Sequence, residues 1–360
     1  MTSDTYFPPA EAEGGWRYAQ SPEEVRDRAH LDPEKLLLGQ REFEWHWGGH
    51  AWSMAVIRHG VLAAEFGSYN VLDGSRFDLW SATKSFTSIA FGILLADQAQ
   101  RETGTNPLAL DSRAYELIPE GYPLTDDRKA LITVRQLLTM TGGFVGSVRG
   151  TAPGTPTALG DGLFEHALGF RTNRHGVDVS RLLADPGTTW EYSDSGFSHL
   201  SLVFAHVAGK EIDVFLNERM FQPIGIPPVS WTRSGGGNLI GPHTVPHTGL
   251  VLSARELARC GYLLLHGGSW EGSELISSKW LDLATQPSQE FNPHYGYAFW
   301  VNSAGTLWTD APRDAFALMG FQGSRCWVVP SLDLVIARVG SGPPIIHDHF
   351  FPRRILDAVI

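Results

Sequence analysis

The pattern of hydrophobic and polar positions changes twice along the chain. Near the start, "DPEKLLLGQREFEWHW" (32–47) predicts a helix that begins at an Asp-Pro cap. The two apolar runs of "AWSMAVIRHGVLAAEFG" (51–67) meet at an Arg-His-Gly turn and predict a β-hairpin. In "LWSATKSFTSIAFGILLAD" (79–97), apolar residues recur at helical spacing and predict a buried helix.

Helical patterns dominate the middle of the chain, from about residue 105 to residue 240, where strand patterns are sparse. "ITVRQLLTM" and "DSGFSHLSLVFAHVAG" are helical segments of this region, and "LSARELARCGYLLLHGG" and "SSKWLDLATQ" follow as two more helices. The stretch 144–176 is long and irregular, which is typical of a loop over a site. We expect this loop to form one wall of a pocket.

Short strand patterns return after residue 294. They are separated by turns and should pair antiparallel; the runs are "HYGYAFWVN", "GTLWTD", "DAFALMGF", "SRCWVVP" and "LDLVIARVG". The final "FPRRILDAVI" predicts a closing helix. Strands at both ends predict an α+β fold, with one antiparallel sheet flanked by helices and a mostly helical inserted region. The predicted units are an N-terminal tail (1–20), a discontinuous sheet domain (21–105 and 240–360) and a mostly helical domain (106–239).

Composition narrows the class of protein only slightly. The 360 residues are 42% hydrophobic and 19% charged, as in an ordinary globular protein. The net charge of −11 argues against nucleic acid or an anionic membrane as partner. No apolar run approaches the roughly 18 residues of a membrane span. The first 25 residues lack a basic start followed by an apolar stretch, so we expect a cytoplasmic protein.

Candidate chemistry begins at the head of the helix predicted at 79–97. Ser81 and Lys84 are three residues apart and therefore share one helix face. A serine hydroxyl is a poor nucleophile unless a neighbouring base takes its proton. A lysine can be that base only where burial or a nearby cation or dipole lowers its pKa. Because Ser-x-x-Lys also occurs by chance, a serine cap followed by a solvated lysine is the competing interpretation.

Two later stretches carry further candidates. In "PGTTWEYSDSGF" (186–197), Tyr192 precedes a predicted helix, with Ser193 or Asp194 as its possible cap. In "ALMGFQGSRCWVVP" (317–330), glycines interrupt a strand, which indicates either a bulge or close approach of a ligand to the backbone. Taken singly, each stretch also fits a structural role.

The order and surroundings of these stretches resemble the serine β-lactamase and penicillin-binding-protein superfamily, from about residue 20 onward. The likeness is greatest to its branch of class C β-lactamases, family VIII carboxylesterases and 6-aminohexanoate-dimer hydrolases. It implies a β-lactamase-like fold, with Ser81 as nucleophile, Lys84 as its activating partner and Tyr192 as a second proton-transfer residue. The backbone N–H groups of Ser81 and Phe321 would form the oxyanion hole. Whether Lys84 or Tyr192 is the acylation base stays open.

The chain departs from the family pattern at two places. Asp194 stands where the family usually has Asn, and it either caps a helix or pairs with Lys84, which would favour Tyr192 as the base. Leu318-Met319-Gly320 stands where the family usually has a cation that receives a substrate carboxylate. A neutral substrate is therefore favoured. The predicted substrate-binding residues are Trp80, Asp194, Leu318, Met319 and Gly320.

The resulting expectation is a serine hydrolase that cleaves a neutral carboxylic ester or amide through a Ser81 acyl-enzyme. The alternatives are a β-lactamase or amide hydrolase of the 6-aminohexanoate-oligomer type, an acyltransferase with the same acyl-enzyme, and a non-catalytic binder. We expect a small-molecule substrate as the partner, and no cofactor. We also expect no metal, because "HTVPH" (243–247) and "HDH" (347–349) lack carboxylate or thiolate companions at a familiar spacing.

Overall fold

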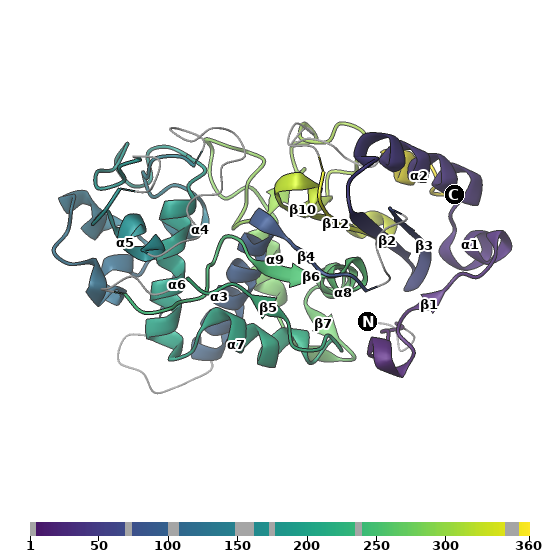
Figure 1. The fold of residues 1–360 in the computed structure, drawn as a ribbon, viewed down its shortest axis with the longest axis horizontal. Coiled ribbons are helices and arrows are strands. Elements are labelled where there is room, and N and C mark those ends of the chain that lie inside the picture. Colours follow the sequence, from purple (N-terminus) through teal and green to yellow (C-terminus); the bar gives the residue numbers. More distant parts are fainter. Residues whose placement is uncertain are drawn as a thin grey trace.

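A seven-stranded sheet forms the centre of the protein. The computed structural model describes residues 5–68, 74–99, 108–147, 162–172, 177–234, 240–342 and 353–360. In spatial order the strands are β1 (Arg17–Tyr18), β3 (Val61–Gly67), β2 (Trp52–Arg58), β12 (Leu334–Gly340), β11 (Arg325–Val329), β10 (Phe316–Met319) and β9 (Trp300–Val301). All neighbours pair antiparallel except β1 and β3, which are parallel. Because β12 pairs with β2 along its whole length, the two ends of the chain meet in mid-sheet, as predicted (Figure 1).

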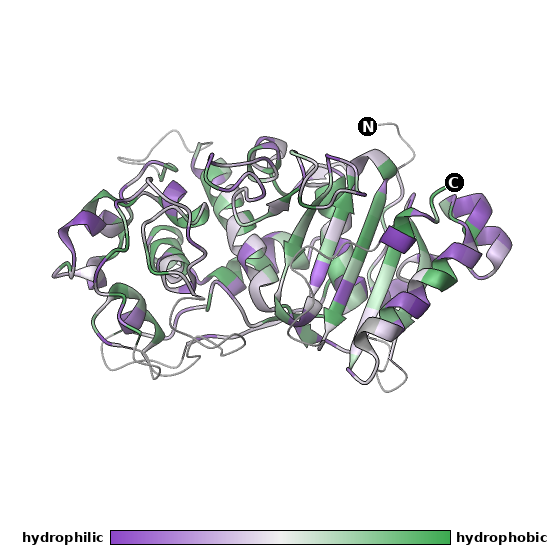
Figure 2. Ribbon diagram, turned by 90° about the horizontal axis from the view of Figure 1, so that it is seen from above, coloured by the Kyte–Doolittle hydropathy of each residue, from purple (hydrophilic) through white to green (hydrophobic). Residues whose placement is uncertain are grey.

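The two faces of the sheet bury separate cores, because successive strand residues point to opposite sides. Val335 and Ala337 of β12 belong to the larger core, whereas Leu334 and Ile336 belong to the smaller one. The helices α3 (Thr83–Ala99) and α8 (Ala254–Leu265) supply residues to the larger core, and α1 (Pro22–Ala29) and α2 (Pro33–Trp47) to the smaller one. Apolar residues line the strands in Figure 2, and polar residues lie on the outer helices.

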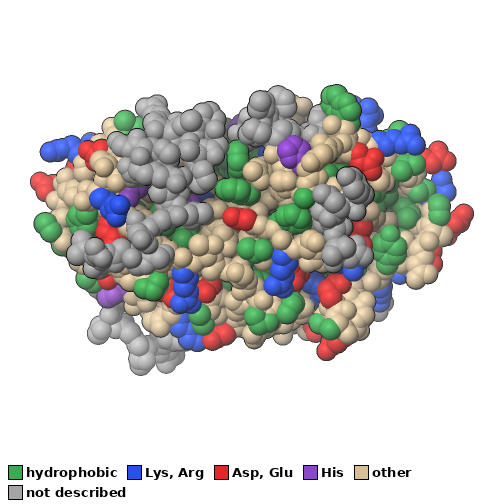
Figure 3. Space-filling model, viewed as in Figure 1, with side chains coloured by type: hydrophobic (Ala, Val, Ile, Leu, Met, Phe, Trp, Pro, Cys, Tyr) green, Lys and Arg blue, Asp and Glu red, His purple; other side chains and the backbone are tan. Residues whose placement is uncertain are grey.

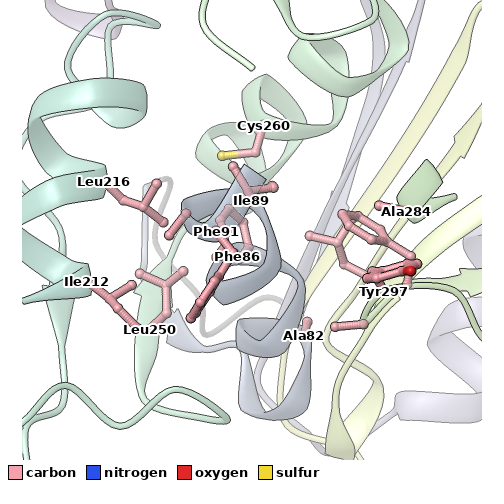
Figure 4. Packing of buried hydrophobic residues seen from close by; sticks show 14 of the residues in the cluster. Ala82, Phe86, Ile89, Phe91, Ile212, Leu216, Leu250, Cys260, Ala284 and Tyr297 are labelled. Atoms are coloured by element: carbon pink, nitrogen blue, oxygen red, sulfur yellow. The ribbon is translucent and has the colours of Figure 1, made fainter. Parts of the chain in front are cut away.

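Helix α3 lies between the sheet and a mostly helical region (Figure 1). That region contains α4 (Val134–Leu138), α5 (Leu163–Leu168), α6 (Asp194–Ala208) and α7 (Ile212–Leu216). In Figure 4, Phe86 and Phe91 of α3 lie near Leu216 of α7, and Ile89 lies beside Cys260 of α8. Every residue of α3 from its start to Leu94 is buried, so the helix joins the two halves through one core.

Two smaller sheets and two short helices complete the described fold. A three-stranded sheet has the order β4 (Phe77–Asp78), β6 (Leu250–Leu252) and β5 (Ser230–Trp231). A short hairpin, β7 (Ser269–Trp270) and β8 (Ser273–Glu274), follows α8, and then comes α9 (Ser278–Ala284). The last helix, α10, is a single turn at Arg353–Leu356. Basic and acidic side chains are interspersed over the face seen in Figure 3.

The structure also corrects parts of the sequence interpretation. "GTLWTD" (305–310) is a turn and not a strand, because the buried Asn302 amide donates to the carbonyls of Trp308 and Ala311 while its oxygen accepts from the Trp308 N–H.

The expected N-terminal tail (1–20) includes strand β1, which pairs with β3. The expected loop includes α5, although 148–161 and 173–176 lie outside the described residues. The domain boundaries remain a prediction. Among the described helices, none is both long and apolar enough to span a membrane.

Gly92, in the middle of α3, offers a test of the packing between α3 and α9. A Cβ added there would overlap the ring of Trp280. Alanine favours a helix over glycine by about 1 kcal/mol, but overpacking a core costs about 1–3 kcal/mol. We therefore expect Gly92→Ala to lower the free energy of unfolding, measured by urea denaturation. The loss should shrink in a Trp280→Leu background, and a stabilised Gly92→Ala protein would contradict this packing.

Candidate active site

Ser81 lies in a single 3-10 turn (Trp80–Ala82) that leads directly into α3. The Asp78 carboxylate supports this turn, because its Oδ1 accepts the N–H of Trp80 at 2.7 Å and that of Gly249 at 3.0 Å. Burial raises the pKa of Asp78, and these hydrogen bonds oppose the rise. Trp80 has a positive φ of 51°, a conformation that bulky residues rarely adopt and that clusters at functional sites. Ser81 is thereby held, partly exposed, at the head of a buried helix.

Lys84 is buried beneath Ser81, with 1% of its side chain exposed. Its Nζ donates to Ser81 Oγ at 2.9 Å and lies 2.7 Å from Asp194 Oδ1. A third, longer contact of 3.4 Å reaches the carbonyl oxygen of His247. Burial lowers the pKa of Lys84, and the charge and hydrogen bond of Asp194 act in the opposite direction. The interpretation of Lys84 as a solvated surface residue is therefore wrong.

Tyr192 and Asp194 reach the site from the start of α6. Ser193 caps this helix by accepting the Gly196 N–H at 3.1 Å, so the interpretation of Asp194 as the cap is wrong. Asp194 is instead the first helical residue, and its carboxylate points to Lys84. Lys84 Nζ lies 4.7 Å from the centre of the Tyr192 ring. The structure thus brings together all three residues predicted to be catalytic.

Ser147, which the sequence did not single out, fixes this segment. Its Oγ accepts the Asp194 N–H at 2.6 Å, and its own N–H donates to the Tyr192 carbonyl at 2.7 Å. Ser147 follows a glycine-rich loop, and serine in a loop is too common to give a signal in the sequence.

The end of β10 closes the site on the side facing Ser81. Gly320 lies against the backbone before Ser81, where an added Cβ would overlap the carbonyl oxygen of Leu79. The Phe321 ring contacts the Trp80 ring edge-on, with 5.5 Å between centroids. The two N–H groups predicted to form the oxyanion hole, those of Ser81 and Phe321, therefore lie on neighbouring segments. Gly320 thus marks the close approach of another backbone segment, and the approach of a ligand to it stays a prediction.

Leu318 and Met319 differ from the expectation that they contact substrate. Leu318 is 0% exposed and packs in the larger core, whereas Met319 is 7% exposed and packs in the smaller one. The alternation of the strand directs them to opposite faces, so neither side chain is open to a bound molecule. Neither of these two residues supplies a cation.

Aromatic rings surround Tyr192. Trp300 is roughly parallel to it at 6.4 Å, and Trp190 and Tyr295 are each centred 6.3 Å away. Tyr295 is buried, and burial raises its pKa well above the usual value. Tyr295 gave no signal in the sequence, because a tyrosine near a strand is usually a packing residue.

The "HTVPH" segment does not gather its histidines into one site. His243 Nδ1 lies 2.8 Å from Glu211, whereas His247 is buried beside Lys84 and lies 3.3 Å from Ser198 Oγ. Burial lowers the pKa of His247 to about 4, so it is neutral at physiological pH. The described residues contain no group of three potential metal ligands. "HDH" (347–349) lies outside them.

This fold, with a serine and a buried lysine at the head of its central helix, indicates a hydrolase of β-lactamase-like fold. The chain belongs to the Beta-lactamase family, whose model matches residues 46–356. A curated relative, 6-aminohexanoate-dimer hydrolase from Paenarthrobacter ureafaciens, is 25% identical over 194 residues. That alignment covers 50% of this chain and 48% of the relative, so the chain spans about half the length of this relative.

Solved structures with the same fold include enzymes of several activities. EstCE1, a hydrolase with promiscuous acyltransferase activity, superimposes with a TM-score of 0.66 at 17% identity and covers 91% of this chain and 97% of its own. A family VIII carboxylesterase has a TM-score of 0.62 at 16% identity, with 91% and 96% covered. A penicillin-binding protein homologue from Caulobacter crescentus has a TM-score of 0.64 at 19% identity, with 91% and 97% covered. At such identities the likeness concerns the fold.

Substituting Gly320 tests the close contact between β10 and the segment before Ser81. Because an added Cβ would overlap the Leu79 carbonyl oxygen, Gly320→Ala must displace either the strand or the Ser81 turn. We expect kcat/KM for an ester to fall by about 10²-fold, the scale of losing one oxyanion donor. Gly241→Ala is the control, since it too lies in a loop, its φ is outside the left-handed region, and nothing lies within 4 Å of an added Cβ there. Unchanged activity in Gly320→Ala would contradict the assignment.

Proposed function

We propose that this protein hydrolyses a neutral, small-molecule carboxylic ester through an acyl-enzyme on Ser81. The observation that carries the proposal is the 2.9 Å hydrogen bond from the buried Lys84 to Ser81 Oγ. A buried cation beside a serine hydroxyl favours the alkoxide that forms when the serine attacks. The Asp194 carboxylate, 2.7 Å from Lys84 Nζ, balances the buried charge of the lysine.

In the proposed acylation, Tyr192 is the base and Lys84 remains protonated. A carboxylate 2.7 Å away favours the ammonium form of Lys84, and the ammonium lies 4.7 Å from the Tyr192 ring, where it favours the phenolate. Tyr192 takes the Ser81 proton while Oγ forms a bond to the ester carbonyl carbon. The oxyanion accepts hydrogen bonds from the backbone N–H groups of Ser81 and Phe321. The C–O bond to the alcohol then breaks, and the alcohol leaves with the proton from Tyr192.

Deacylation follows the same route with water as the nucleophile. Tyr192 takes a proton from water, the hydroxide adds to the acyl carbon, and Ser81 leaves and regains that proton. The product forms as a carboxylic acid, which then loses its proton to water. Leu318, at the position where the family usually has a cation, is uncharged and buried, so a substrate with a carboxylate near the scissile bond gains no charged partner there.

Amide hydrolysis and acyl transfer are the alternatives. Amide hydrolysis draws on the likeness to 6-aminohexanoate-dimer hydrolase, and acyl transfer on the likeness to EstCE1. In acyl transfer a bound alcohol or amine would replace water. The partly exposed rings of Trp80, Trp190 and Trp300 offer surfaces on which an apolar acceptor could stack.

Pre-steady-state kinetics with p-nitrophenyl acetate test the acyl-enzyme. We expect a burst of p-nitrophenol equal to the enzyme concentration, no burst from Ser81→Ala, and a fall in kcat of at least about 10³-fold. Ser85→Ala is the matched control. Ser85 is a buried serine of α3 that directly follows Lys84, and its hydroxyl donates to the Ala298 carbonyl. A burst that persists in Ser81→Ala would overturn the proposal. An added alcohol that yields mainly the transferred ester would favour the acyltransferase.

The pH profile of Asp194→Asn tests which residue is the base. Asp194 opposes the lowering of the Lys84 pKa by burial, so its removal lowers that pKa further. If Lys84 must stay protonated, the alkaline limb of the kcat/KM profile moves to lower pH. If a neutral Lys84 were the base, the acid limb would move to lower pH instead and overturn the assignment. Asp97→Asn is the control, since it removes an ion pair with Arg219 at the other end of α3.

A further inference from the structure

The backbone turn that carries the Phe321 N–H is in an unfavourable local conformation. Gln322 has φ 57° and ψ 13°, and Gly323 has φ 83°, so two consecutive residues are left-handed. Glycine tolerates this region, whereas glutamine does so only when its surroundings hold it there. One hydrogen bond within the turn, from the Gly320 N–H to the Ser324 carbonyl at 2.7 Å, closes its base. The Gln322 peptide at its tip needs a contact from elsewhere.

Arg338 supplies that contact. It lies on β12, opposite Arg325 of β11, and its side chain is fully buried. One guanidinium nitrogen donates to the Gln322 carbonyl at 2.7 Å, and the other donates to the Ser341 carbonyl at 2.6 Å. The planar fork therefore ties the tip of the turn to the end of a central strand. Hydrogen bonds from a charged donor are roughly twice as strong as neutral ones, so this tie is rigid.

We propose that Arg338 is a positioning residue that aims the Phe321 N–H at the oxyanion. The inference rests on the proposed function, because it assigns a purpose to the turn only if Ser81 forms a tetrahedral intermediate. With the Gln322 carbonyl held on one side and the Gly320–Ser324 bond on the other, the peptide of Phe321 has little freedom to rotate. Without the guanidinium, Gln322 can leave the left-handed region, and the Phe321 N–H turns away from the oxyanion.

The contact of Trp80 with Phe321 couples the same turn to the nucleophile. Their rings meet edge-on at 5.5 Å, and Ser324 Oγ donates to the Asp78 carbonyl at 3.1 Å. Both oxyanion donors are thereby tied to one scaffold, which begins at Asp78 and ends at Arg338. A positioning role predicts a loss in the transition state with little change in ground-state binding.

The test compares Arg338→Met and Arg338→Lys with Arg58→Met. Arg58 is a matched control, because it too is a buried arginine of the sheet, and it donates to the carbonyls of Leu332 and Ala29. It pairs with Leu334, four residues from Arg338 along β12 and therefore roughly 13 Å from it. Each protein is measured for the acylation rate with p-nitrophenyl acetate, for KM, for the affinity of a phenylboronic acid and for its urea midpoint.

We expect Arg338→Met to slow acylation by about 10- to 100-fold and to weaken boronic acid binding by a similar factor, with KM nearly unchanged. Arg338→Lys retains one charged donor and should recover part of the rate, which keeps the test open if the methionine variant does not fold. Arg58→Met should lower the urea midpoint without changing the acylation rate of the folded protein.

Two results would overturn the inference, and they can be told apart by whether the wild-type protein gives a burst. If the wild-type protein gives a burst and the Arg338 variants acylate at the wild-type rate, or if Arg58→Met slows acylation equally, Arg338 has only a structural role. If the wild-type protein gives no burst, the proposed function fails and the inference fails with it.

Discussion

The charge of Lys84, buried at the start of the central helix, is the constraint on which the rest of the site depends. A lone ammonium in an apolar core is so costly that it normally loses its proton or finds a partner. Here the partner is Asp194, 2.7 Å away on another helix. The ion pair therefore joins the head of α3 to the head of α6 and places Tyr192, two residues before Asp194, beside the lysine.

The sheet contributes the opposite wall by close backbone contact. Gly320 allows the end of β10 to approach the segment before Ser81 more closely than any side chain would permit. The turn that follows is held by Arg338 from the middle of the sheet. Two kinds of constraint thus meet at Ser81: an ion pair between helices on one side and backbone packing against a strand on the other. Each acts on a different part of the proposed reaction, the proton transfer and the oxyanion.

Much of the fold followed from local patterns. The Asp-Pro cap of α2, the β2–β3 hairpin, the burial of α3 and the pairing of both chain ends in one sheet were all predicted correctly. The failures were places where distant contacts override local preference. "GTLWTD" has the composition of a strand, yet the Asn302 side chain organises it as a turn. Strand β1 has only two residues, too few to produce a periodic signal.

The sequence by itself, through its resemblance to the family, singled out Ser81, Lys84 and Tyr192 as the candidate catalytic residues, and their roles stay a prediction. It left open whether Asp194 caps a helix or pairs with Lys84, and it predicted that Leu318 and Met319 contact substrate, although both side chains are buried. Only the tertiary structure decided these points. The first depends on a contact between residues 110 positions apart, and the second on which face of the sheet each side chain meets. Neither the distance across the fold nor the choice of face is encoded in a local pattern.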